Sequence, residues 1–246
     1  MCFTADNRRR PILRKTAGLA GMLLMLIICL SAVGCSGGKR TDHMDEMKRY
    51  AEQKYGESFE TVSYRAAKDE TYYDVLVLSK NGIRFNVLRS AEGDFSDTYP
   101  AAVINEKMTG YFKDLDAFGL KDREFYLDVF PGGDEAVDID FASNSAEKIA
   151  EYGFDRLTAV ILTEQDIKSQ KEALYKTYSA FSGLNPKHFS FEVLQIEKKD
   201  EKLMDMLNNM TGTYENDWNS FSGIRSWLSV SEGGIASADE LVEGVH

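Results

Sequence analysis

Cys35 carries the clearest chemistry in this sequence. Its thiol is a nucleophilic group that can accept a diacylglyceryl chain, and it stands directly after the small residues Ala32-Val33-Gly34. Small side chains at these positions fit the substrate pocket of a signal peptidase. The residue types and their order therefore suit attachment of a lipid to a cysteine beside a cleavage site.

The segment before Cys35 has the composition of an export signal. Residues 17–34 contain no charged side chain, and five basic residues precede them: Arg8, Arg9, Arg10, Arg14 and Lys15. Positive charge stays in the cytoplasm while an apolar run enters the bilayer. A basic start followed by an apolar run forms the first two parts of a secretory signal.

Together, these residues resemble the bacterial lipoprotein signal, or lipobox. Ala32 stands where that signal most often has Leu, although small residues are also accepted there. The resemblance implies a signal peptide at 1–34, cleavage between Gly34 and Cys35, and lipidation of Cys35. It also implies attachment to the extracytoplasmic face of the cell membrane through the lipid.

Two alternatives remain open for the apolar run. About 18 or more apolar residues can span a bilayer, so the run could be a retained transmembrane helix, and ordinary secretion is the third reading. Ser36-Gly37-Gly38 favours cleavage, because such residues form a flexible linker, whereas a retained span more often meets aromatic or charged anchors. We therefore interpret residues 35–41 as the lipidated cysteine and a short tether.

Cysteine and histidine usage excludes several kinds of site. Cys2 and Cys29 would leave with the signal, so the mature domain would have no disulfide, no cysteine-ligated zinc and no internal cysteine nucleophile. The histidines are His43, His188 and His246, and only His188 could serve in a Ser-His-Asp arrangement. An ordinary surface histidine is the better interpretation. We expect no cofactor and no metal, and we assign no catalytic residue.

The net charge of the mature domain indicates which classes of partner it can bind. Removing residues 1–34 takes five basic and one acidic residue from totals of 29 and 40, which leaves 24 and 39 and a net charge of −15. Such a domain repels nucleic acid, so we expect no nucleic-acid partner. Basic peptides, cations and polycationic surfaces remain possible partners, but acidity for solubility is the simpler explanation.

Two local clusters have a functional and a structural interpretation each. Four carboxylates lie close together in the sequence at Asp134, Glu135, Asp138 and Asp140. Such a cluster suggests a calcium site, but the spacing does not match an EF-hand loop. A solvated acidic loop is therefore favoured. Late aromatic residues could form a platform for sugar or peptide, yet closure of the core is more common. These are Tyr214, Trp218, Phe221 and Trp227.

The first half of the domain, residues 42–116, predicts a helix and a three-stranded antiparallel unit. A helix capped by Thr41 or Asp42 would end at Gly56, and strands are expected near 59–65, 72–78 and 83–89. Asn81-Gly82 predicts a tight hairpin, because both residues tolerate positive φ. A second helix follows from about 98 to 115. Arg84 and Arg89 could form a basic strip, but their odd spacing argues against a shared face.

The second half, residues 117–230, alternates strand and helix. Strands are expected at 125–130, 157–162, 189–196 and 224–230, with helices near 144–153, 163–183 and 203–212. This predicts an α+β fold: an antiparallel sheet with flanking helices, and a split βαβ, ferredoxin-like second half with its helices on one face. Residues 231–246 read as a small, polar tail.

The segment Met47 to Glu60, MKRYAEQKYGESFE, resembles the mature start of small uncharacterised lipoproteins of Gram-positive bacteria. The resemblance implies an outer-surface location and no known activity. No G-x-x-x-x-G-K-[ST], G-x-G-x-x-G or H-E-x-x-H motif occurs in the chain. The sequence thus predicts a non-enzymatic binding or interaction module with an unidentified protein, peptide or glycan partner. The alternative is a carboxylate-dependent hydrolase of cell-envelope polymers.

Overall fold

A computed structural model describes residues 38–68, 73–132, 140–208, 210, 218–231 and 234–246. The signal peptide, Gly34, Cys35 and residues 36–37 of the tether lie outside these ranges, as do Asp134, Glu135, Asp138 and Tyr214. Within the described ranges, no helix combines the length and the hydrophobicity needed to cross a bilayer. The interpretation of residues 1–37 therefore stays a prediction.

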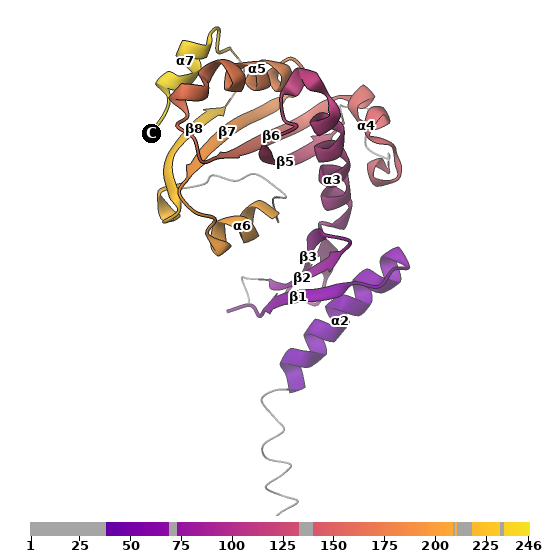
Figure 1. The fold of residues 1–246 in the computed structure, drawn as a ribbon. Helices are drawn as coiled ribbons and strands as arrows, with labels where there is room; N and C mark the ends of the chain where they lie inside the picture. Colours follow the sequence, from indigo (N-terminus) through magenta and orange to yellow (C-terminus); the bar gives the residue numbers. More distant parts are fainter. Residues whose placement is uncertain (1–37, 69–72, 133–139, 209, 211–217, 232–233) are drawn as a thin grey trace, which may run out of the picture.

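The described chain folds into two four-stranded sheets with flanking helices, which confirms the α+β class (Figure 1). The first sheet, sheet A, is antiparallel with strand order β1-β2-β3-β4. Its elements are α2 (Gly38–Tyr55), β1 (Glu60–Arg65), β2 (Asp74–Lys80), β3 (Ile83–Arg89) and β4 (Phe95–Asp97). We call these elements lobe A.

Two expectations for lobe A were wrong and one was confirmed. The sheet has four strands rather than three, because Phe95–Asp97 pairs with β3. Helix α2 begins at Gly38, so residues 38–41 belong to a helix and not to a tether. The hairpin between β2 and β3 forms at Asn81 and Gly82, which have φ values of 53° and 87°. That conformation suits a tight turn between twisted strands.

Lobe A is held together by alternating apolar residues on one face of its sheet. Leu76, Leu78, Phe85 and Val87 are buried beneath α2. The carboxylate of Asp97 fastens α2 to β4, accepting hydrogen bonds from Lys54 at 2.8 Å and Tyr55 at 2.6 Å. Burial opposes the ionisation of Asp97, but these hydrogen bonds lower its pKa overall.

The second sheet, sheet B, is mixed and has strand order β5-β6-β7-β8. Its strands are β5 (Glu124–Pro131), β6 (Phe154–Thr163), β7 (His188–Ile196) and β8 (Ile224–Ser231). The helices around it are α4 (Ala146–Tyr152), α5 (Lys171–Ser182), α6 (Glu201–Asn208) and α7 (Ala238–Glu243), with 3₁₀ turns at Asp116–Phe118, Phe141–Ser143, Lys168–Gln170 and Trp218–Ser220. We call this part lobe B.

The ferredoxin-like arrangement expected for the second half was wrong. Strands β6 and β7 are parallel and directly adjacent, with Leu157 opposite Phe189, and α5 connects them. A split βαβ unit would place another strand between them. Sheet B is instead a simple βαβ unit with an antiparallel strand added on each side.

The helices of lobe B cover both faces of sheet B, whereas one face was expected. Leu157, Ala159 and Ile161 point into the core formed with α3, α4, α5 and α7. Val160 and Leu162 point into a second core with α6 and the 3₁₀ turn at Trp218. Neighbouring side chains in a strand point to opposite sides of the sheet. The successive apolar residues of β6 therefore need a core on each face of sheet B.

Residues 234–246 are part of the fold and not a tail. Ser237 caps α7 by accepting a hydrogen bond from the Glu240 amide at 3.2 Å, and Leu241 is buried in the main core. The backbone of His246 exchanges two hydrogen bonds with Trp227 of β8, at 2.9 and 3.2 Å. The mostly polar composition of this segment led to the prediction of a tail, although a few of its apolar residues pack in the core.

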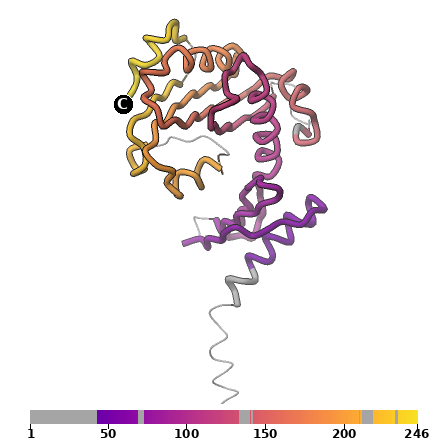
Figure 2. The backbone as a smooth tube through the Cα atoms, in the orientation of Figure 1, coloured from indigo at the N-terminus to yellow at the C-terminus, as the bar shows by residue number. Residues whose placement is uncertain are grey.

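Helix α3 (Tyr99–Asp114) joins the two lobes. Its first turn places Ala102 in the core of lobe A, and its later turns place Met108 and Phe112 in the core of lobe B. Figures 1 and 2 show the helix rising from sheet A along sheet B. A boundary at residue 116 therefore assigns α3 to the first unit, although most of its buried face packs in the second.

Candidate functional site

A cleft opens where the two lobes meet. It has a volume of about 300 Å³. Four elements line it: the β2–β3 hairpin tip, one side of α3, the first half of β5, and the end of α6. Its lining residues are Gly82, Ile83, Arg84, Ala102, Asn105, Glu106, Thr109, Lys113, Arg123, Glu124, Phe125, Tyr126, Leu127, Leu207, Asn208 and Met210.

Asn105 fixes the geometry of this cleft. The side chain is buried, and its Oδ1 accepts a hydrogen bond from the Val129 amide at 2.8 Å. Its Nδ2 donates to the Met210 carbonyl at 3.1 Å. One amide group therefore ties α3 both to the edge of β5 and to the chain after α6. A lone asparagine in a helix carries no sequence signal for such a role.

Arg84 reaches across the cleft from lobe A to lobe B. Its Nη1 lies 3.0 Å from Oδ1 of Asp205 on α6. Both side chains are partly exposed, so the pair contributes roughly 0–1 kcal/mol to stability. Arg89 instead lies 3.6 Å from Glu46 and 3.8 Å from Asp74. The two arginines do not form one basic strip.

Arg123 lines the cleft at the start of β5. The side chain is half-buried, and burial lowers the pKa of the guanidinium. Its Nη1 donates to Oε1 of Gln170 at 3.2 Å, and Gln170 donates in turn to the Thr163 hydroxyl at 2.9 Å. Among the described residues, Arg123 therefore has an uncharged partner. A second, more open cavity of about 590 Å³ lies around Gln170 and shares Arg123 with the cleft.

Glu124 is the acidic neighbour of Arg123, and it is already engaged. Its carboxylate accepts a hydrogen bond from the Tyr126 hydroxyl at 2.9 Å and lies 2.7 Å from Nζ of Lys199. Burial and the hydrogen bond to Glu124 raise the pKa of Tyr126. Glu124 is thus engaged with Lys199 and Tyr126, and no described acidic side chain pairs with Arg123.

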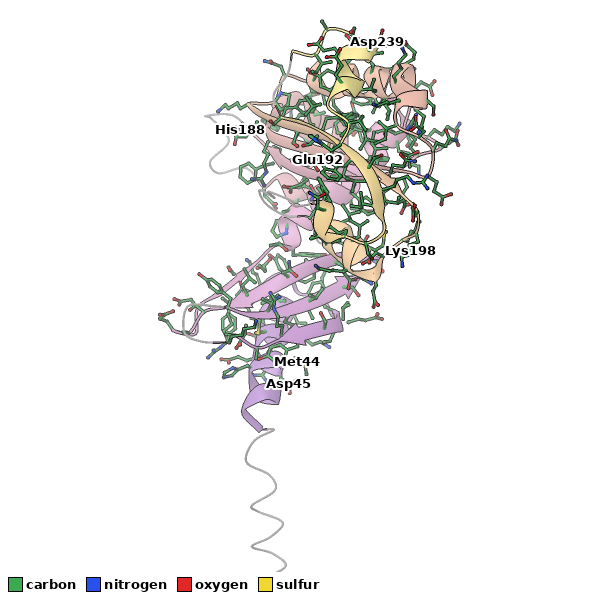
Figure 3. The ribbon with its side chains drawn as sticks, turned by 90° about the vertical axis from the view of Figure 1, so that its left-hand side faces the viewer. Met44, Asp45, His188, Glu192, Lys198 and Asp239 are labelled. Carbon is green, nitrogen blue, oxygen red and sulfur yellow. The ribbon has the colours of Figure 1, made fainter. Side chains whose placement is uncertain are left out.

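Glu192 is a buried acid on the α6 side of sheet B, in the middle of β7 (Figure 3). Burial raises its pKa, while Ser190 and Trp218 act in the opposite direction. Its Oε2 has no hydrogen-bond partner among the described residues. Asp128 lies on the same face, two strands away, and pairs with Arg156 at 3.2 Å. A hydrolase would need two such acids across an open cleft.

The protonation of Glu192 should make stability depend on pH. Because the pKa is raised in the folded state, folding favours the protonated form, and stability falls as pH rises above the ordinary glutamate pKa of about 4.3. Glu192→Gln should therefore unfold at higher urea concentration than the parent at pH 7 to 8. This difference between the two urea midpoints should shrink towards pH 4.5, where the unfolded glutamate also becomes protonated.

Glu164→Gln is the matched control for this experiment, since Glu164 is exposed at the end of β6. Its urea midpoints should follow those of the parent at every pH. Identical pH profiles for Glu192→Gln and the parent protein would show that the buried carboxylate does not titrate as described.

The other candidate residues from the sequence are not gathered in the cleft. His188 is exposed at the first position of β7, at the margin of the sheet in Figure 3. Trp218 and Phe221 are buried together, with ring centroids 5.9 Å apart, and Trp227 stacks on His246 at 5.4 Å. Closure of the core was thus the correct interpretation for the described aromatic residues.

The acidic loop offers no described metal site. Asp140 is exposed and accepts a hydrogen bond from the Ser143 hydroxyl, and its three acidic companions lie outside the described residues. Across the described ranges, no group of three or more histidine, cysteine, aspartate or glutamate side chains is placed to hold a metal ion.

Comparison with known proteins gives little further guidance. No protein-family model and no curated protein matches the chain. Among solved structures, the crystal structure of a DUF5037 family protein from Ruminococcus gnavus is similar over 76% of this chain and 90% of its own, with 12% sequence identity and a TM-score of 0.44. A likeness of this degree assigns neither a family nor a function.

Proposed function

We propose that this chain is a lipoprotein anchored at the extracytoplasmic face of the cell membrane, and that it acts as a non-enzymatic binding module. Residues 8–35 support the anchor, because a basic start, an apolar run and Cys35 occur in the order of a lipoprotein signal. The membrane is then a partner through the lipid alone. Nucleic acid is not expected at a domain with a net charge of −15.

The cleft between the lobes is the observation that carries the binding function. Its volume of about 300 Å³ suits a small ligand, and four elements contribute to its wall. Apolar Ile83 and Leu207 lie in the same wall as Arg123, whose charge has no acidic partner among the described residues. Concave sites with an apolar lining and a few polar groups are typical of ligand binding.

A test of this function compares the protein with a variant whose cleft is filled. The full-length protein is extracted in detergent, and its urea unfolding is measured in the absence and in the presence of candidate ligands. The candidates are amino acids, short peptides, sugars and phosphorylated compounds. We expect at least one class to stabilise it, by about 2.7 kcal/mol at one hundred times its dissociation constant. Thr109→Trp places an indole in the cleft and should abolish this stabilisation.

Ser179→Trp is the control variant, because Ser179 is exposed on α5 and does not line the cleft. It should respond to the ligand as the parent protein does. Equal stabilisation of the parent and Thr109→Trp, or no stabilisation by any class, would refute the cleft as the ligand site.

The hydrolase is the second candidate, and Glu192 is the observation that favours it. A buried acid with a raised pKa suits a general acid, and Asp128 on the same face could be the second carboxylate. Hydrolysis of cell-wall glycan or peptide by the full-length protein, lost in Glu192→Gln, would replace the binding module with this enzyme. Inactivity of the parent protein on those substrates would remove the hydrolase.

A further inference from the structure

The outer edge of β5 faces the cleft, and several of its backbone groups have no partner among the described residues. Strand β5 is at the margin of sheet B, and the Val129 amide points away from β6 because it donates to Asn105. The register between β5 and β6 is unbroken from Glu124 to Phe130. In an antiparallel pair, alternate residues direct both N–H and C=O to the same side. The backbone groups of Phe125 and Leu127 therefore also point outward.

These outward groups lie in the wall of the cleft, since both residues line it. In the described part of the chain, no hydrogen bond joins the Phe125 or Leu127 backbone to α3 or α6. An exposed strand edge of this kind binds an extended peptide by adding it to the sheet. Asn105 pairs with the edge at Val129, and in the described ranges no other group pairs with it at Phe125 or Leu127.

The dimensions of the cleft fit a short extended peptide. Residues 123–127, from Arg123 just before β5 to Leu127 within it, span roughly 13 Å at 3.3 Å per residue. The residues of α3 that line the cleft run from Ala102 to Lys113, which is about 16 Å along a helix. A groove of this length takes three or four extended residues. The volume of about 300 Å³ is too small for a full additional strand.

The charges in the groove differ between its two ends. Helix α3 runs antiparallel to β5, because Asn105 meets Val129 and a short connection leads from the end of α3 to Arg123. Lys113 and Arg123 therefore share one end, and Glu106 lies about two helical turns away. Two other charged groups are already paired, Glu124 with Lys199 and Arg84 with Asp205.

We infer that the cleft binds a short peptide with a free carboxyl terminus, whose main chain pairs antiparallel with the edge of β5 at Phe125 and Leu127. The carboxylate contacts Arg123 and Lys113, and the amino end points towards Glu106. This assignment rests on the proposed binding function and specifies its ligand class. It requires no covalent step.

Amide hydrogen exchange tests the pairing directly, with tri-alanine as the probe and full-length protein in detergent. Addition of the peptide should slow exchange at Phe125 and Leu127 at least 10-fold. The Tyr126 amide, which points towards β6, should change little. Peptide binding with unchanged exchange at both edge amides would overturn the pairing.

The carboxylate contact is tested with Arg123→Gln and with tri-alanine amide. Arg123→Gln should weaken binding of tri-alanine at least 10-fold and leave the weaker binding of the amide unchanged. Lys121→Gln is the control, since Lys121 is exposed and lines the second cavity and not the cleft. Equal weakening of peptide and amide would contradict the contact.

The two proposals fail in different ways. If tri-alanine does not bind but another compound class stabilises the parent and not Thr109→Trp, the peptide assignment is wrong and the binding function stands. If no compound class stabilises the parent, both are wrong.

Discussion

Replacing Cys35 with serine is expected to move the protein from the membrane fraction to the soluble fraction almost completely. Each methylene of an acyl chain in the bilayer contributes about 0.8 kcal/mol, and stable anchoring requires more than one chain. Without the thiol there is no acceptor for the diacylglyceryl group. The parent protein should carry the mass of the lipid on an amino-terminal Cys35, and Cys35→Ser should lack it. Membrane fractionation and intact-mass measurement check both expectations.

Cys29→Ser is the matched control, because it changes another thiol within the apolar run and keeps the residues around the cleavage site. It should remain in the membrane with the full lipid mass. A parent protein that retains residues 1–34 and carries no lipid mass would instead support the transmembrane helix. Release of the unmodified parent protein would support ordinary secretion.

Because α2 includes Gly38, lobe A starts closer to the proposed lipid anchor than the expected tether implied. Gly38 is helical, and it stands three positions after Cys35 in the sequence. Three steps along an extended chain cover at most about 11 Å. With Cys35 lipidated, α2 begins within this distance of the bilayer surface. The cleft is lined by the β2–β3 hairpin tip and by α3. Figure 1 shows α3 leaving lobe A on the side away from the start of α2.

Local patterns were sufficient to predict most strands and helices. Asn81-Gly82 specified its hairpin because few residues tolerate positive φ, and the alternation of Ile83, Phe85 and Val87 specified β3. The run 157–162 correctly indicated a strand buried on both faces. The expectation that all helices lie on one face of the sheet was inconsistent with this run. A strand buried on both faces needs side chains packed against each face, and α6 packs on the second one.

Pairings over long sequence separations were beyond these patterns. Arg84 and Asp205 meet across 121 positions, and the Tyr178 hydroxyl accepts hydrogen bonds from the amides of Gly234 and Ile235 at 3.1 Å each. No local rule links such residues. The cleft could not be predicted for the same reason, because the four elements that form its wall are joined only in the folded chain. Its central residue, Asn105, looks like any polar residue of a helix.

Asn105→Ala is expected to lower the free energy of unfolding by about 3 kcal/mol. The substitution leaves the Val129 amide and the Met210 carbonyl without their partner, and each unsatisfied buried group costs about 1–3 kcal/mol. The midpoint of urea unfolding should fall accordingly. Asn144→Ala is the control, since this asparagine donates to the Asp140 carbonyl at 3.1 Å in an exposed setting. It should cost less than about 1 kcal/mol.

The variant Asn105→Asp distinguishes the contributions of the two hydrogen bonds that the Asn105 side chain makes. A carboxylate still accepts from the Val129 amide but presents an oxygen to the Met210 carbonyl, so the variant should be destabilised at neutral pH. At low pH the protonated acid can donate again, and its deficit relative to the parent should shrink. A loss in Asn105→Ala no larger than in Asn144→Ala would mean that water in the cleft replaces both bonds. Asn105 would then line the cleft without fixing α3 to β5 and to the chain after α6.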